Sequence, residues 1–187
     1  MPILGIMASS VLKATSSFES IASATGTGSS ATITFSSIPS TYKHLQIRCT
    51  ARSDSGISSD FIILRLNNDS GANYTYHGIE VETNTVSAFA ATGETAGFGT
   101  RVTTSTVASN IMGTDIIDIS DYASTNKNKT IRHFGGDDRN GVSPASSLGI
   151  RSNLWISTSA INRIDIISYR GANWTTASTF ALYGIKG

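Results

Sequence analysis

The chain of 187 residues is poor in charge, since only 14% of its residues are Asp, Glu, Lys or Arg, against roughly 25% in an ordinary soluble domain. The 14 basic and 13 acidic residues nearly cancel, to a formal net charge of +1. Binding to nucleic-acid phosphates needs a basic surface, and docking to an anionic membrane needs a polybasic segment. The composition therefore argues against a nucleic-acid partner and against a membrane partner.

Cysteine and long apolar runs are also scarce. Cys49 is the single cysteine, so neither a disulfide within the chain nor a cysteine-based zinc site can form. It falls at an alternating apolar position, and we expect a small buried side chain there. No stretch approaches the roughly 20 apolar residues of a membrane helix. The opening residues lack the basic region of a secretory signal, so none is predicted.

Hydroxyl groups take the place of charge. Ser and Thr account for 52 of the 187 residues, and the mean hydropathy is −0.01. That value is too apolar for a disordered Ser/Thr linker. Thr, Ile, Val, Tyr and Phe dominate the patterned stretches, as they do in strands. The composition predicts one all-β domain, long enough to bury about 70% of the surface that the unfolded chain exposes.

Apolar and polar residues alternate along most of the chain, which is the pattern of half-buried strands. Residues 44–51 are the clearest case, with Leu45, Ile47 and Cys49 on one face. Turn residues separate the alternating runs. The expected strands span residues 18–24, 31–36, 44–51, 61–66, 73–82, 111–120, 130–134, 147–156, 162–169 and 178–185.

Three segments between these runs contain turn residues or show little alternation of apolar and polar residues. Residues 25–30 are expected to join the first two runs as a hairpin, and residues 135–141 form an expected extended turn. Residues 83–107 are expected to be a long connection with short strands and surface loops. The whole pattern predicts an all-β, antiparallel β-sandwich, jelly-roll-like, over residues 17–187, preceded by an extended N-terminal arm at residues 1–16.

The sequence contains none of the usual catalytic or cofactor motifs, such as a nucleophile elbow, a P-loop or a dinucleotide fingerprint. The three histidines are scattered. Asp115 and Asp121 are expected on the strand face opposite Asp118, so these carboxylates do not converge. We predict a protein that is not an enzyme, with no catalytic residue, no cofactor and no metal site. Calcium at the loops of Asp121 or of residues 137–138 is the weaker alternative to ordinary turn chemistry.

Four aromatic residues have a candidate role. Trp155 lies in an apolar run and is expected in the core or in an interface. Trp174 lies in a loop beside Asn173, where its ring could stack on a sugar or plug one end of the sandwich. Together with Tyr74 and Tyr76 it makes up the set of candidate receptor or glycan contacts.

Four blocks of the sequence resemble small virion proteins of tailed bacteriophages, especially marine and cyanobacterial ones. The most distinctive block is FALYGIKG at residues 180–187. The others are FESIA at 18–22, ITFSSIPSTYKHLQIR at 33–48 and DISDYASTNKNKTIR at 118–132. The resemblance implies a structural role in the virion without enzyme activity. It transfers no binding residues and does not fix the position on the particle.

Capsid decoration is the favoured function within that resemblance. A compact sandwich, expected to be a trimer, would sit on the head as a cement protein. The arm would reach across subunits of the major capsid protein and bury apolar surface, at roughly 25 cal/mol per Å². Three arms would raise the avidity of attachment. The expected arm contacts are Ile3, Leu4, Ile6 and Met7.

Two other functions stay open on the sequence. The chain could be a tail or fibre component whose sandwich is a receptor-binding tip, with Tyr74, Tyr76 and Trp174 against a host surface glycan. It could also be a free carbohydrate-binding module, because sandwich folds host lectins.

Overall fold

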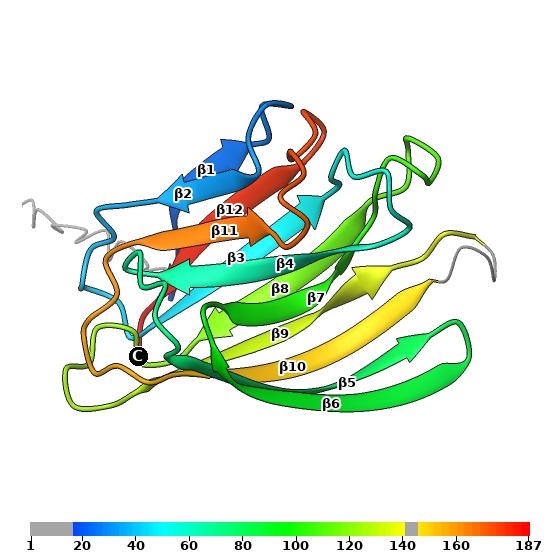
Figure 1. The fold of residues 1–187 in the computed structure, drawn as a ribbon. Coiled ribbons are helices and arrows are strands. Elements are labelled where there is room, and N and C mark those ends of the chain that lie inside the picture. Colours follow the sequence, from blue (N-terminus) through cyan, green and yellow to red (C-terminus); the bar gives the residue numbers. More distant parts are fainter. Residues whose placement is uncertain (1–16, 141–145) are drawn as a thin grey trace, which may run out of the picture.

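A computed structural model describes residues 17–140 and 146–187, and the expected N-terminal arm lies outside this range. Over the described residues the secondary structure consists of strands without a helix, and every pairing between strands is antiparallel. The fold is a β-sandwich of two sheets (Figure 1). The strands are β1 (Phe18–Thr25), β2 (Thr32–Phe35), β3 (His44–Ala51), β4 (Asp60–Leu66), β5 (Tyr74–Glu82), β6 (Thr85–Glu94), β7 (Gly97–Val102), β8 (Gly113–Ile119), β9 (Lys129–Asp137), β10 (Ser147–Trp155), β11 (Ile164–Ser168) and β12 (Thr179–Ile185).

The two sheets differ in size. The larger sheet has eight strands in the order β1-β12-β3-β8-β9-β10-β5-β6, and the smaller has four in the order β2-β11-β4-β7. The chain crosses repeatedly from one sheet to the other, with β5-β6 as a hairpin and β8-β9-β10 as a meander in the larger sheet. The predicted antiparallel sandwich is confirmed. The jelly-roll connectivity and the arm stay predictions.

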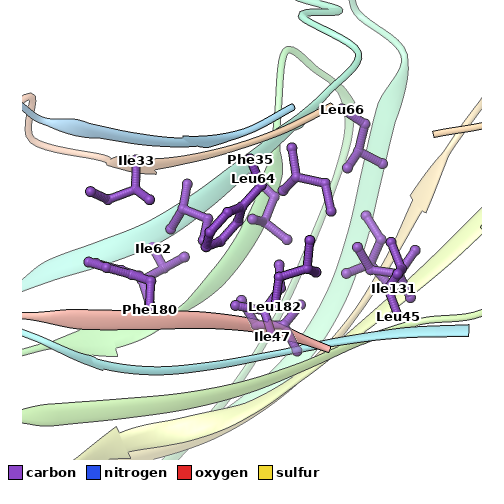
Figure 2. Close-up of a cluster of buried hydrophobic side chains, with 14 of the residues drawn as sticks. Ile33, Phe35, Leu45, Ile47, Ile62, Leu64, Leu66, Ile131, Phe180 and Leu182 are labelled. Atoms are coloured by element: carbon purple, nitrogen blue, oxygen red, sulfur yellow. The ribbon is translucent and has the colours of Figure 1, made fainter. Parts of the chain in front are cut away.

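The core fills the space between the sheets (Figure 2). Burial alternates along most strands, so every second side chain points inward, as in β3, where Leu45 and Ile47 are completely buried. In β4 the inward Ile62 and Leu64 face them from the smaller sheet. The expected burial of Cys49 is confirmed, and so is the expected core position of Trp155, which is 2% exposed.

Three local expectations need correction. Residues 18–36 do not form a hairpin, because β1 pairs with β12 in the larger sheet whereas β2 pairs with β11 in the smaller one. The segment 83–107 is mostly strand, since it contains β6 and β7. The expected turn at 135–141 begins later, because Gly135 and Gly136 continue β9. A side chain at Gly135 would lie 2.2 Å from the carbonyl oxygen of Thr114, so this glycine permits close strand packing rather than a turn.

The smaller sheet covers only part of the larger one. Its edge strand β7 packs over β9 and β10, and the β5-β6 hairpin extends beyond it (Figure 1). The inner face of β5, β6 and β10 is therefore partly open beside β7. The candidate site lies there.

Candidate functional site

A pocket of about 190 Å³ opens where β7 meets the uncovered part of the larger sheet. We call it the rim pocket. Its walls combine aromatic rings from both sheets with two arginines and two glutamates. The residues that line it are Phe61, Tyr76, Glu80, Glu82, Ser87, Phe89, Phe98, Arg101 and Arg151.

The aromatic rings of the rim pocket form one connected cluster. Tyr76 from β5 stacks on Phe98 from β7, with ring centroids 5.2 Å apart and an angle of 22° between the planes. Phe98 also lies 5.0 Å from Phe61, and the edge of Phe89 meets Tyr76 at 6.2 Å. These separations are those of favourable aromatic pairs. Burial raises the pKa of Tyr76, and the nearby carboxylate of Glu94 raises it further.

A chain of ion pairs forms the charged part of the pocket. Glu80 is 5% exposed and accepts hydrogen bonds from both Arg101 Nε and Arg151 Nη2. Arg101 also makes a bidentate pair with Glu82, at 2.8 Å through Nη1 and 2.7 Å through Nη2. Two cations and two anions balance, so the pocket carries no net charge. Glu82 is 44% exposed and marks its mouth.

Arg151 is the most deeply buried charge of the pocket, with a side chain only 2% exposed. Its guanidinium carbon lies 4.4 Å from the ring centroid of Phe89, 4.7 Å from that of Phe98 and 5.2 Å from that of Phe61. Such cation–π contacts strengthen when water is excluded. Burial lowers the pKa of Arg151, and Glu80 opposes that effect. Within the described residues, Nε and Nη1 of Arg151 have no hydrogen-bond partner.

The rim pocket has the chemistry of a small binding site. Its volume is below the roughly 300–1,000 Å³ of a site for a drug-sized ligand, so it suits one ring or one side chain. Its aromatic walls offer stacking, and its ion pairs offer both donors and acceptors. The residues that line it include neither a histidine nor a cysteine, and their hydroxyl groups are those of Ser87 and Tyr76. The arrangement is suited to binding one ring by stacking and by hydrogen bonds at the mouth.

A second polar group lies deeper, between the sheets. His133 Nδ1 is 2.8 Å from Asp115 Oδ2, and neither side chain is exposed. The backbone N–H of Thr100 also donates to Asp115 Oδ2, at 3.4 Å. Within the described chain, His133 Nε2 has no hydrogen-bond partner, so no nucleophile is joined to this pair. We interpret the pair as structural.

The outer face of the larger sheet carries an uncharged, largely apolar surface, which we call the apolar band. It crosses β8, β9, β10, β5 and β6 at positions that the strand register places side by side. The outer face of an antiparallel sheet is ordinarily polar where it meets water. The band consists of the row Ile116, Phe134, Ile150, Ile79 and Ala88 and the row Thr114, Gly136, Leu148, Val81 and Val86.

The structure separates the three aromatic residues predicted as receptor contacts. Tyr76 lines the rim pocket, but Tyr74 and Trp174 have no exposed surface. The Trp174 ring packs edge-on against Phe180, with centroids 5.5 Å apart, and so closes one end of the core. Neither buried ring can stack on a ligand at the surface, so the structure does not place Tyr74 or Trp174 as a receptor or glycan contact. The predicted arm contacts at residues 3, 4, 6 and 7 lie outside the described residues.

The acidic loops provide little for a metal ion. In residues 17–140 and 146–187 no group of three His, Cys, Asp or Glu side chains could hold one. Asp121 instead accepts a hydrogen bond from Lys127 at 2.6 Å and forms an ion pair with Lys43 at 2.8 Å, and the two lysines hold the pKa of its carboxyl well below the usual range. Asp137 accepts a hydrogen bond from Ser147 at 2.8 Å. These carboxylates serve turn and strand packing.

Sequence reasoning missed most of the rim pocket. Phe89 and Phe98 lie in the segment expected to be a connection, where Ala, Thr and Gly obscure the period. One signal was present. Glu82 pairs with Thr85 across the two-residue turn of Thr83 and Asn84, and asparagine is favoured in tight hairpin turns. A hairpin predicted at this turn would have placed Phe89 in the same sheet as Tyr76.

Comparison with known proteins adds no relative: no protein-family model, no curated protein and no solved structure matches the chain. Among the described residues, no helix is long and apolar enough to cross a membrane.

Proposed function

We propose that the protein is a non-enzymatic structural protein of a bacteriophage virion, and that it decorates the capsid. Three features support the proposal: the resemblance of four sequence blocks to phage virion proteins, the low charge, and the apolar band. The band is the observation that carries most weight. A protein that works alone in water has little reason to keep two uncharged rows on the open face of a sheet. A protein that is always assembled with others has such a reason, because a partner covers the two rows.

The attachment to the head is assigned to the arm. Its apolar side chains at positions 3, 4, 6 and 7 would bury surface between major capsid subunits, and a homo-oligomer would present several arms at once. Neutral hydroxyl-rich surfaces make wet, polar contacts that depend weakly on salt. Binding to purified heads is therefore expected to persist at high ionic strength.

The test is the copy number in purified particles, measured by mass spectrometry against the major capsid protein. A ratio that matches the head lattice supports decoration. A ratio of a few copies per particle overturns it and places the chain on the tail, and absence from the particle overturns both positions. A chain with Ile3→Ser, Leu4→Ser, Ile6→Ser and Met7→Ser is expected to stay folded and to lose binding to heads.

The second candidate is a tail or fibre component with a receptor-binding sandwich, and the rim pocket favours it. The pocket is neutral, lined by aromatic rings, and sized for one ring. A neutral pyranose offers apolar C–H faces to Tyr76 and Phe98, and its hydroxyls can meet Glu82 and Arg101 at the mouth. The expected partner is then a host surface glycan.

Saturation-transfer NMR with methyl glucopyranoside, methyl galactopyranoside and N-acetylglucosamine tests this pocket. Tyr76→Ala is expected to abolish any signal, whereas Tyr183→Ala, a tyrosine on β12, is expected to leave it unchanged. Absence of signal with all three sugars contradicts a site for a single neutral pyranose. Sugar binding by a chain that is absent from the particle would instead identify a free carbohydrate-binding module.

A further inference from the structure

We propose that the apolar band is the contact surface for a second copy of this chain, packed face to face about a two-fold axis. The inference deepens the proposed function by naming one partner, and it rests on the same band. It concerns the association of the purified chain with itself. It can therefore fail while the virion role holds, and the virion role can fail while it holds.

The register of the larger sheet gathers the band into one patch. Ile150 pairs with Phe134 on one side and with Ile79 on the other. Leu148 and Val81 form a direct cross-strand pair in the next row. Side chains paired in this way stand about 5 Å apart on the same face. Ten positions over five strands therefore form one continuous surface without a charge.

The size of the band fits a dimer contact. Its large side chains are well exposed, from 37% for Ile116 to 68% for Val86. Six of them offer on the order of 500 Å² of apolar surface, at the upper end of what a monomer leaves exposed in one patch. A stable interface buries about 800 Å² on each partner. The apolar side chains of the band alone therefore supply more than half of that area, about 500 Å² of about 800 Å².

The border of the band is compatible with a second copy. The positions around the band hold charges of both signs. Asp118 is paired with Arg132, Arg48 is paired with Ile116 of the band, and the exposed Asp138 follows the end of β9. The border therefore carries both signs, and two copies can meet without the repulsion that a border of one sign would cause. Such a border does not favour a strongly acidic or a strongly basic partner. Two sheets packed face to face stand about 10 Å apart, which is the thickness of two interdigitated layers of such side chains.

The relief of the band is also self-complementary. Phe134 is the largest side chain and is half exposed, whereas the surface over Ile79, Ala88 and Ile150 is hollowed. A two-fold axis between β10 and β5 sets Phe134 of one copy opposite Ala88 of the other. A two-fold contact repeats that fit, because each copy offers the same patch.

The edge strand β6 gives a second, independent indication that this region is covered. Natural proteins protect exposed edge strands with lysine, proline, bulges or short length. β6 is ten residues long, and its sequence TVSAFAATGE contains no Lys, Arg or Pro. The bulge and the carboxylate of β6 lie at its end, at Gly93 and Glu94, so residues 85–92 have neither. The bulge of β1 lies within the strand, between Ser20 and Ala22. A copy packed over the band would also shield β6.

The oligomeric state of the full chain tests the proposal, by analytical ultracentrifugation between about 1 and 100 μM, the range of ordinary protein affinities. A dimer, or an even-numbered oligomer, is expected. Ile150→Lys, in the centre of the band, is expected to weaken association at least tenfold. Ser23→Lys, on the far side of the same sheet face, is the matched control and is expected to leave it unchanged. Circular dichroism verifies that both variants fold.

Three results overturn the proposal: a monomer throughout the range, an exclusively trimeric protein, or a dimer that Ile150→Lys leaves intact. If Ile150→Lys fails to fold, Ala88→Lys replaces it, because that residue is exposed on an edge strand. Copy number in the particle is a separate measurement. A dimer that is absent from virions leaves this proposal standing and removes the proposed function.

Discussion

Tyr42 lies directly against Gly184. A Cβ atom on Gly184 would come within 2.3 Å of Cγ of the Tyr42 ring. The Tyr42 hydroxyl donates to Glu19 Oε2 at 3.1 Å. The three residues come from segments that lie far apart in the sequence. The contact joins these segments at the β1 edge of the larger sheet, where β12 lies between β1 and β3.

Gly184→Ala is expected to destabilise the fold by about 1–3 kcal/mol, because the added methyl group has to displace an aromatic ring. Urea unfolding followed by fluorescence measures the loss. Gly56→Ala is the control, since nothing lies within 4 Å of a Cβ there, and it is expected to change the stability by less than about 0.5 kcal/mol. Equal effects of the two substitutions would contradict the contact.

Asp115 and His133 are expected to act as a unit. Asp115→Ala leaves His133 Nδ1 buried without its partner, so a loss of about 3 kcal/mol is expected. His133→Leu should cost a similar amount. The double variant is expected to lose less than the sum, by about 1 kcal/mol or more, because the orphaned polar group is gone. Additive losses in a double-mutant cycle would show that the two side chains do not interact.

Arg151→Met is expected to destabilise the protein by about 2–3 kcal/mol, because it leaves Glu80 buried with one cation instead of two. Arg151→Lys keeps the charge but loses the planar stacking on three rings, and should fall between Met and wild type. Arg48→Met removes an exposed arginine and serves as the control, with a change below about 0.5 kcal/mol. Thermal unfolding that ranks the three variants differently would contradict this account of the rim pocket.

Alkaline pH is expected to destabilise the fold through Tyr74. Burial raises the pKa of Tyr74 to about 12, whereas an unfolded tyrosine titrates near 10. Between these values the folded state keeps the proton that the unfolded state has lost, so its stability falls as the pH rises from about 10 to about 12.

Tyr74→Phe tests that pH dependence. The variant is expected to be less stable at neutral pH, because the Leu66 N–H loses its acceptor. Its stability should nevertheless fall less steeply above pH 10 than that of wild type. Parallel curves for the two proteins, measured by urea unfolding from pH 8 to 12, would rule out Tyr74 as the cause.

Much of the sandwich could be predicted along the chain. Where one face is buried and the other is wet, as in β3, the alternation of residues states which side chains point inward. The pattern failed where the two faces are chemically alike. β6 has small or apolar residues on both faces, so it resembled a connection. The predicted hairpin of β1 and β2 was wrong for another reason: a short loop does not reveal that the next strand enters the other sheet.

The sequence by itself determined the all-β class, the positions of most strands, and the burial of Cys49 and Trp155, because these depend on local period and on transfer of apolar side chains from water. Only the tertiary structure decided which residues gather into sites. Arg151, Phe89 and Phe98 come from separate strands of two sheets, and the apolar band depends on the register of five strands. The alternation within a strand indicates which side chains face inward, but it does not indicate which distant strand lies beside it, so these groups depend on contacts between distant segments.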